Sequence, residues 1–302
     1  MIQERGIFKD NPRNQGLALA VITFVNWGFS PIYLNAVKFA SAWELWAIRS
    51  LLFVPFMALY ISYERQWPDV RSLLKNMRML GATCLCAVLM AANNILFMYA
   101  VSIGRALECS LSNFILPLVN IFCGVILFKE TLNRPQKTAV VLAALGVTAL
   151  TWVTGEVPRF ALAMPLLFAA YASIRKWAGL SAVSSSFVEM VLAAPLAAAV
   201  LAVLAAKGTL VFGSLTLKHD GLLLFSVIFF LPSYIMYNQA IKMIDLSLVG
   251  FLQYITPVLQ FVIAVLFLRE KFTLSMALCY LVIWVALVFF SVGAFRRERR
   301  GS

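Results

Sequence analysis

The stretch NFILPLVNIFCGVILFKE, at residues 113–130, is matched 140 positions later by QYITPVLQFVIAVLFLRE, at residues 253–270. The two align without a gap, and their amides, isoleucines, prolines and basic–acidic pairs coincide. The matched pairs are Asn113 with Gln253, Ile115 with Ile255, Pro117 with Pro257, Asn120 with Gln260, Lys129 with Arg269, and Glu130 with Glu270. A match at one fixed shift predicts an internal repeat, in which the second half of the chain repeats the first.

Composition places this repeat in a membrane. Of the 302 residues, 62% are hydrophobic and 13% are charged, against about 25% charged in soluble globular chains. A helix that crosses the hydrocarbon core needs roughly 20 apolar residues. Ten such runs nearly fill the chain, at about 15–38, 41–63, 78–102, 105–129, 134–154, 157–179, 185–207, 218–243, 245–268 and 272–294. The runs are continuously apolar rather than alternating, which argues against a β-barrel. We therefore predict an all-α membrane protein with ten transmembrane helices.

The predicted organisation divides these spans equally between the two halves. Residues 1–14 form a cytoplasmic N-terminal segment, 15–154 the first repeat with spans 1–5, 155–295 the second with spans 6–10, and 296–302 a basic cytoplasmic tail. Because five is an odd number, the repeats must have opposite orientations, as in secondary transporters that bind substrate between inverted repeats. The hydrophilic stretch 64–78 is predicted to be a cytoplasmic loop.

The distribution of charge predicts orientation rather than a nucleic-acid partner. The formal net charge is +12, but the basic residues lie between spans and not on one patch. With the N-terminus in the cytoplasm, 17 Lys and Arg fall in inner segments and 7 in outer ones, and Arg49 lies inside a span. The positive-inside rule then places both termini in the cytoplasm. The five cysteines are scattered without metal-ligand spacing, so no metal is expected.

The repeated stretch carries polar residues on one helix face. Asn113, Pro117 and Asn120 lie at i, i+4 and i+7, and Gln253, Pro257 and Gln260 repeat the pattern. Amides inside hydrocarbon need partners, so each stripe should face protein or water. Two interpretations remain open: hydrogen-bonded contact between helices, or the polar wall of a central cavity that binds substrate.

Aromatic side chains supply further candidates for contact with substrate. A pocket with several rings and a few amides suits an amphipathic small molecule, and the candidates from spans 1, 3, 6, 8 and 9 are Trp27, Tyr33, Asn94, Tyr99, Tyr171, Tyr237 and Tyr254. The alternative for such rings is an interfacial belt near the ends of the spans.

One arginine lies inside the predicted bilayer. Arg49 stands roughly 12 Å into span 2 at 1.5 Å of rise per residue, and buried charges in membranes are costly. We predict a structural pair with Glu108, a few residues into span 4; the alternative is that Arg49 holds a substrate carboxylate. The sequence contains no catalytic constellation and no GxxxxGK[ST] loop for ATP, so neither an enzyme nor a cofactor is predicted.

Several motifs resemble a known family. The pattern Trp27-Gly28-x-x-Pro31-x-Tyr33, the stretch FLQYITP at 251–257 and the stretch IWVAL at 283–287 are similar to EamA/RarD-like proteins of the drug/metabolite transporter superfamily. The resemblance implies ten helices in two inverted repeats and a carrier of the bacterial inner membrane. Members of the superfamily export amino acids, drugs and other metabolites, and they include the YddG-type amino acid exporters.

The motifs and the resemblance lead to one expected function. We expect a monomeric secondary transporter, surrounded by membrane lipid, that exports amino acids and related small metabolites by alternating access. Aromatic and other amphipathic amino acids fit the predicted pocket best. Two alternatives remain open: a multidrug exporter of chloramphenicol-like compounds, and a membrane sensor that transports nothing.

Overall fold

The computed structural model describes residues 12–103, 106–154, 159–267 and residue 285. Every regular element within these residues is a helix. The helices are α1 (Pro12–Gly28), α2 (Ser30–Ala36), α3 (Ala42–Tyr63), α4 (Trp67–Lys75), α5 (Met77–Ser102), α6 (Ala106–Leu127), α7 (Arg134–Thr154), α8 (Arg159–Ala178), α9 (Ser184–Ala206), α10 (Leu217–Met243), α11 (Leu246–Leu252) and α12 (Ile255–Leu266).

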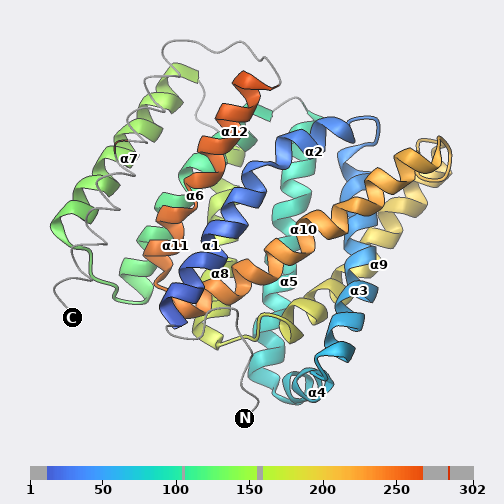
Figure 1. Ribbon diagram of the computed structural model, residues 1–302, viewed down its shortest axis with the longest axis horizontal. Coiled ribbons are helices and arrows are strands. Elements are labelled where there is room, and N and C mark those ends of the chain that lie inside the picture. Colours follow the sequence, from blue (N-terminus) through green and yellow to red (C-terminus); the bar gives the residue numbers. More distant parts are fainter. Residues whose placement is uncertain (1–11, 104–105, 155–158, 268–284, 286–302) are drawn as a thin grey trace.

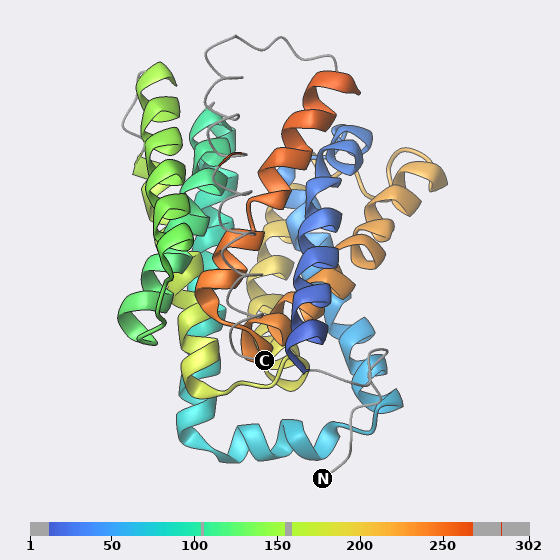
Figure 2. The same ribbon diagram turned by 60° about the vertical axis from the view of Figure 1, so that its left-hand side comes forward.

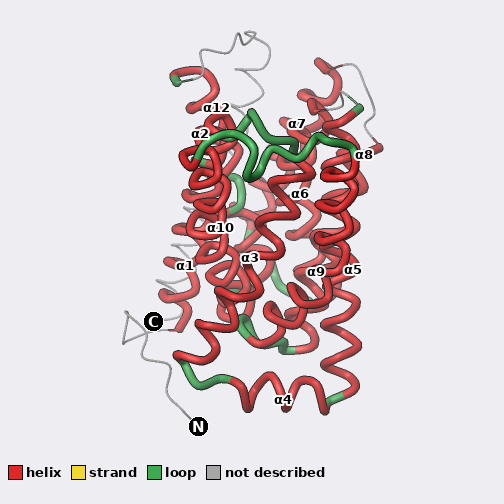
Figure 3. The backbone as a smooth tube through the Cα atoms, turned by 90° about the vertical axis from the view of Figure 1, so that its right-hand side faces the viewer, coloured by secondary structure: helices red, strands yellow, loops and turns green. Residues whose placement is uncertain are grey.

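Most of the long helices run up and down along one common direction, and α10 crosses them obliquely (Figures 1 and 3). We call the side where α4 lies the α4 end and the opposite side, where α2 lies, the α2 end. Helices α3, α6, α8 and α10 begin at the α2 end. The helices α5, α7 and α9 begin at the α4 end, as do the consecutive pairs α1–α2 and α11–α12. The short helix α4 lies across the bundle at its own end (Figure 2).

The chain is a multi-span membrane protein. Five helical stretches are long and apolar enough to cross a bilayer: Pro12–Ala36, Ala42–Tyr63, Met77–Phe97, Ser184–Ala206 and Leu217–Met243. Shorter apolar stretches follow in Ser112–Leu127, Lys137–Gly146 and Leu246–Gln260. Large apolar side chains such as Leu59, Val88 and Ile228 are more than 60% exposed on the bundle, and a lipid surround satisfies such a surface.

Three predicted segments differ in detail from the structure. The first predicted span, 15–38, is divided into α1 and α2 at Phe29, because Pro31 in the first turn of α2 starts a new helix there. The predicted span 245–268 is divided at Gln253 and Tyr254, ahead of Pro257. Proline lacks the N–H that a continuous helix needs.

The third difference is the predicted loop 64–78, which instead contains helix α4. Its Val70 and Leu73 are buried against α9 and α3, while Arg71 and Lys75 are exposed. An amphipathic turn of this kind lies along the membrane surface with its apolar face inward. Several predicted segments lie outside the described residues: 1–11, the predicted division at 155–158, the predicted tenth span at 272–294 (apart from residue 285) and the tail at 296–302.

The long helices pack against one another in pairs. Helix α3 packs against α9, and α6 packs against α11 and α8, while α1 packs against α10 and α5 packs against α8. Helices α6 and α11 cross closely at Gly250 of α11, where an added Cβ would lie 2.7 Å from the backbone oxygen of Pro117 in α6. The largest buried core joins α1, α5, α6, α8, α10 and α11 around Tyr171 and Tyr237.

Candidate functional site

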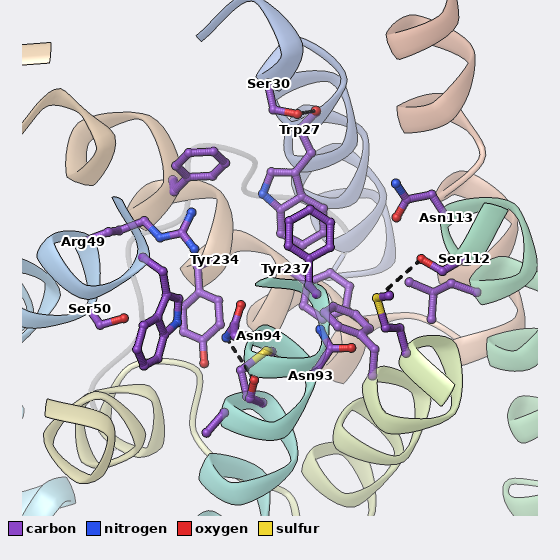
Figure 4. A pocket seen from close by; sticks show the side chains of 18 of the residues that line it. Trp27, Ser30, Arg49, Ser50, Asn93, Asn94, Ser112, Asn113, Tyr234 and Tyr237 are labelled. Carbon is purple, nitrogen blue, oxygen red and sulfur yellow. Dashed lines mark hydrogen bonds between the residues drawn. The ribbon is translucent and has the colours of Figure 1, made fainter. Parts of the chain in front are cut away.

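A cavity of about 340 Å³ lies between the helices (Figure 4). Helices α3, α8 and α6 begin at the α2 end and contribute Arg49, Met164 and Asn113 from their first halves, whereas α9 and α10 contribute Glu189 and Tyr237 from their parts nearer the α4 end. Helix α5, which ends at the α2 end, contributes residues from its second half, up to Phe97. The cavity therefore extends from the α2 end into the middle of the bundle, and its volume suits a small molecule.

One wall of the cavity is aromatic. The rings of Trp27 and Tyr237 lie 5.5 Å apart, and those of Phe168 and Tyr237 also lie 5.5 Å apart, between centroids. Phe24 supports both from behind, with centroids 5.9 Å from Trp27 and 6.2 Å from Tyr237. Rings fixed in this way keep their positions with little loss of conformational freedom when a ligand binds.

A second part of the wall carries amides. Gln260 donates from Nε2 to the backbone oxygen of Trp27 and to Ser30 Oγ, both at 3.3 Å. Asn113 and Gln253 also line the cavity. Asn94, on the opposite wall, donates from Nδ2 to the oxygen of Met90 at 2.9 Å, four residues earlier in α5. These groups can orient a polar ligand without supplying charge.

The two polar stripes meet where α6 crosses α11. Asn120 Nδ2 donates to Gln253 Oε1 at 2.6 Å, with Asn120 fully buried and Gln253 only 5% exposed. Tyr254 donates from its hydroxyl to the backbone oxygen of Phe114 at 3.2 Å. Asn120 and Gln253 thus join the two helices, and Asn113, Gln253 and Gln260 also line the cavity, so Gln253 takes part in both.

The floor of the cavity is a buried charge cluster. An ion pair joins Arg175 Nη1 of α8 to Glu189 Oε1 of α9, and the two side chains are 1% and 3% exposed. The other carboxylate oxygen accepts hydrogen bonds from Tyr234 at 2.7 Å and Tyr171 at 3.3 Å. Arg175 Nη2 donates to the Ser185 hydroxyl at 2.9 Å. Glu189 and Tyr234 line the cavity, and the buried ion pair lies on the side of the cavity nearer the α4 end.

Further hydrogen bonds make the floor continuous across three helices. Asn238 of α10 accepts from the Tyr171 hydroxyl at 3.2 Å and donates to Ser186 Oγ of α9 at 3.0 Å. The Tyr171 and Tyr234 hydroxyls lie 2.9 Å apart. In a low-dielectric interior the network is stabilised because the Glu189 carboxylate and the hydroxyls of Tyr171 and Tyr234 are partnered.

A second acidic group organises the α4 end. Glu130, in the connection after α6, accepts from the backbone N–H groups of Leu246 and Ser247, both at 2.8 Å, and so caps the start of α11. Lys176 donates to the same carboxylate at 3.1 Å. Burial alone raises the pKa of Glu130, but the hydrogen bonds from Ser247 and Leu246 and the charge of Lys176 outweigh it, so this pKa lies below its ordinary value.

The structure places the predicted contact residues in two groups. Those that line the cavity are Trp27, Asn94, Asn113, Tyr237, Gln253, Pro257 and Gln260. The others do not line it, and these are Tyr33, Tyr99, Pro117, Asn120, Tyr171 and Tyr254.

The residues outside the cavity have other contacts. Tyr33 donates to the oxygen of Leu222 at 3.0 Å. Tyr99 is 51% exposed beside Phe160, because it points from α5 toward the bundle surface. Tyr171 lies in the floor.

The predicted pair of Arg49 and Glu108 stays a prediction, since the side chain of Glu108 lies outside the part that the structure describes. Arg49 lines the cavity, and its Cζ lies 4.7 Å from the centroid of the Phe230 ring. Glu44, in the first turn of the same helix, accepts from the N–H groups of Val211 and Phe212 at 2.9 and 2.6 Å. In the described ranges, no three His, Cys, Asp or Glu side chains come together as a metal site.

The sequence interpretation missed the floor. Arg175 and Glu189 lie near the ends of two different predicted spans, 157–179 and 185–207, and neither belongs to the repeated polar stripes. The available signal was the coincidence of an arginine, a glutamate and the serines at 181 and 184–186 around one short connection between apolar runs. Polar groups that dense beside hydrocarbon must satisfy one another.

Comparison with known proteins gives a consistent relationship. A model of the EamA-like transporter family matches residues 14–152. Protein RarD of Salmonella typhi is 34% identical over 286 residues, covering 95% of this chain and 97% of its own. An uncharacterized transporter of Vibrio cholerae is 32% identical over 278 residues, covering 92% of both chains. A chloramphenicol-sensitive protein RarD of Pseudomonas aeruginosa is 30% identical over 280 residues, covering 91% and 92%.

A solved crystal structure with 15% sequence identity superimposes with a TM-score of 0.71, covering 92% of this chain and 97% of that one, which shows a shared fold. The relatives are at least 30% identical and match nearly the full length of the chain, which shows the family. The chain therefore belongs to the EamA/RarD-like transporters of the drug/metabolite transporter superfamily.

Proposed function

We propose that this transporter exports amino acids and related small metabolites across the bacterial inner membrane by alternating access. The observation that carries the proposal is the cavity of about 340 Å³, which joins an aromatic wall to a few fixed amides. The rings of Trp27 and Tyr237 suit an apolar or aromatic side chain, and Gln260 and Asn113 suit the polar groups of the amino acid.

We further propose ten spans in two inverted repeats, 15–154 and 155–295. The shift of about 140 residues pairs α1 with α8, α3 with α9, α5 with α10, and α6 with α11–α12. The helix contacts show the same correspondence between the two halves. The contact of α1 with α10 corresponds to the contact of α8 with α5, and the contact of α10 with α3 corresponds to the contact of α5 with α9. The pairs α3–α9 and α6–α11 map onto themselves, as helices on a pseudo-two-fold axis do.

One contact supports this axis directly. Phe114 and Tyr254 are separated by the repeat shift of 140 residues, and they touch through the Tyr254 hydroxyl. The predicted tenth span at 272–294 would complete the second repeat opposite α7. A carrier with this symmetry can exchange one closed end for the other by rocking one repeat against its partner.

The direction of opening follows from the floor. The buried cluster of Arg175 and Glu189 separates the cavity from the α4 end. If both termini are cytoplasmic, as the distribution of basic residues predicts, the α4 end faces the cytoplasm. The conformation is then closed to the cytoplasm, and the transport cycle must break the cluster to load substrate from inside.

The partners follow from the same features. We propose a small-molecule substrate, a lipid surround for the exposed apolar side chains, and a monomer as the working unit. Nucleic acid is not among the proposed partners.

Two alternatives have less support. A multidrug exporter of chloramphenicol-like compounds would confer resistance, whereas a relative of this chain is named as chloramphenicol-sensitive, a name that does not favour export of that drug. A sensor that transports nothing has no need of a cavity with a floor of partnered charges.

Flux from proteoliposomes tests the proposal. Purified protein is reconstituted with a panel of labelled amino acids, and efflux is compared with that from empty vesicles. We expect faster efflux for aromatic and branched amino acids, and a reduced rate for Asn113→Ala and Gln253→Ala at unchanged protein content. Gln239→Ala, an amide of α10 outside the cavity, is the matched control. Efflux equal to that of empty vesicles across the panel would reject amino acid export.

A further inference from the structure

Arg49 brings a positive charge to the cavity. It lies in the second turn of α3, is half-buried, and reaches from α3 toward the centre of the cavity (Figure 4). Its guanidinium lies over the face of Phe230, with Cζ 4.7 Å from the ring centroid. An aromatic face stabilises a cation but leaves the N–H donors at the guanidinium edge available.

The nearby carboxylates of the described chain are engaged elsewhere. Glu189 is bound by Arg175 and by the hydroxyls of Tyr171 and Tyr234. Glu44 accepts from the backbone of the connection between α9 and α10. Across the described ranges, the two ion pairs are Arg175 with Glu189 and Lys176 with Glu130, so neither includes Arg49.

A guanidinium in this position is costly to retain inside a membrane, and such residues are usually functional or paired. An ion pair with a carboxylate from the ligand would offset that cost each time the site is occupied. The planar fork of Arg matches a carboxylate in two parallel hydrogen bonds. A phosphate monoester would bring a second charge, for which the cavity walls offer amides and rings but no second unpaired cation among the described lining residues.

We propose that Arg49 binds the carboxylate of the substrate and thereby selects carboxylates over their amides and amines. This inference rests on the proposed function, because it names the anchor of the exported molecule. The carboxylate lies at Arg49 and Phe230, and the apolar side chain extends to the wall of Trp27 and Tyr237. The site therefore takes monocarboxylates with an apolar or aromatic side group.

The test compares L-phenylalanine with L-phenylalaninamide, which keeps the ring and the ammonium group but lacks the carboxylate. Efflux from proteoliposomes is measured for the parent protein, Arg49→Lys and Arg49→Gln. We expect the half-saturating phenylalanine concentration to rise at least about tenfold in Arg49→Gln, since a charge-assisted hydrogen bond is lost. Arg49→Lys should lie between, and the slower efflux of the amide should not change.

Arg78→Gln is the matched control, because Arg78 also lies over an aromatic ring, with Cζ 4.5 Å from the centroid of Trp177, at the α4 end. An equal loss for both substrates in Arg49→Gln, or no loss for either, would overturn the proposal and return Arg49 to a structural role.

A binding measurement separates this inference from the transport proposal. The melting temperature of the purified protein is followed during titration with phenylalanine or its amide, since a ligand that binds only the folded state raises it. A rise in melting temperature with phenylalanine that Arg49→Gln abolishes supports the carboxylate site even if no flux is measured. In that case only the proposal of amino acid export would fail. A shift of equal size in the parent protein and Arg49→Gln, or no shift in either, would contradict the site.

Discussion

The buried pair at the cavity floor gives a strong quantitative prediction. In Arg175→Met the cation is removed, while the Glu189 carboxylate stays enclosed with only the hydroxyls of Tyr171 and Tyr234 as donors. Removal of one partner from a buried ion pair costs ~3–5 kcal/mol in the free energy of unfolding, because the remaining charge is left uncompensated. The exposures of 1% and 3% place this pair in that class.

Replacement of both partners should be far milder. In Arg175→Met with Glu189→Leu, no buried charge remains, and apolar side chains of similar volume replace a buried pair at little or no cost. The double variant should therefore be more stable than Arg175→Met alone. Its floor would lack the attraction that holds α8 to α9, so we expect the α4 end to open more readily.

The assay is reversible unfolding of the purified protein in mixed micelles, followed by circular dichroism as the fraction of denaturing detergent rises. Lys176→Met is the matched control, since its pair with Glu130 is more accessible, at 18% and 10% exposure. A partly exposed pair contributes only ~0–1 kcal/mol. If Arg175→Met lowered the free energy of unfolding no more than Lys176→Met does, Glu189 would not be left as an uncompensated buried charge. That result would refute the reasoning on the floor.

Three further predictions concern helix contacts at the α4 end and the crossing of α6 with α11. Because the pKa of Glu130 is lowered in the fold, its carboxylate stabilises the fold above the unfolded pKa of about 4.3, and this stabilisation is lost as the pH falls through the folded pKa. The free energy of unfolding should therefore fall less steeply between about pH 5 and 3 in Glu130→Gln than in the parent protein. Identical pH profiles would exclude the cap. Gly250→Ala should destabilise by ~1–3 kcal/mol through overpacking, whereas Gly221→Ala, where an added Cβ meets nothing within 4 Å, should not, and equal melting temperatures would contradict the close crossing. Asn120→Leu should cost ~1–3 kcal/mol by leaving Gln253 without its donor, as read by chemical unfolding, and a neutral result would show that this bond contributes nothing.

The sequence predicts a helical membrane protein because hydrocarbon imposes a strong and simple constraint on composition, and five described helical stretches are long and apolar enough to cross a bilayer. The shift of 140 residues also singles out Gln253 and Gln260, and both line the cavity. Helix direction follows from alternation once the spans are known. These features depend on hydropathy and on symmetry, which a single sequence records.

The orientation of individual side chains is less predictable. Tyr99 and Trp27 both lie deep in apolar runs, yet Tyr99 points to the surface and Trp27 into the cavity. The difference depends on the rotation of each helix, which packing against neighbours decides. Similarly, Asn120 and Gln253 are 133 residues apart in the sequence, yet their side chains join α6 to α11. The close crossing of these helices at Gly250 brings the two residues together.

The floor shows the clearest limit. Arg175 and Glu189 are 14 residues apart on two antiparallel helices, so no periodic pattern within one helix connects them. The positive-inside rule assigns Arg175 to the inner membrane face, but the rule does not distinguish a solvated arginine from one that a neighbouring acid has drawn into the bundle.

Access to the cavity from each face of the membrane tests the central claim most directly. Ser50, which lines the cavity beside Arg49, is replaced by cysteine in a variant whose five natural cysteines are changed to serine. A small charged thiol reagent that cannot cross the membrane is added to one face at a time. We predict rapid labelling from the α2 end, slowing of that labelling by phenylalanine, and labelling from the α4 end only after the floor is weakened by Glu189→Gln. Equal labelling from both faces in the parent protein, or labelling that no transported substrate slows, would contradict a single substrate cavity that opens to one side at a time.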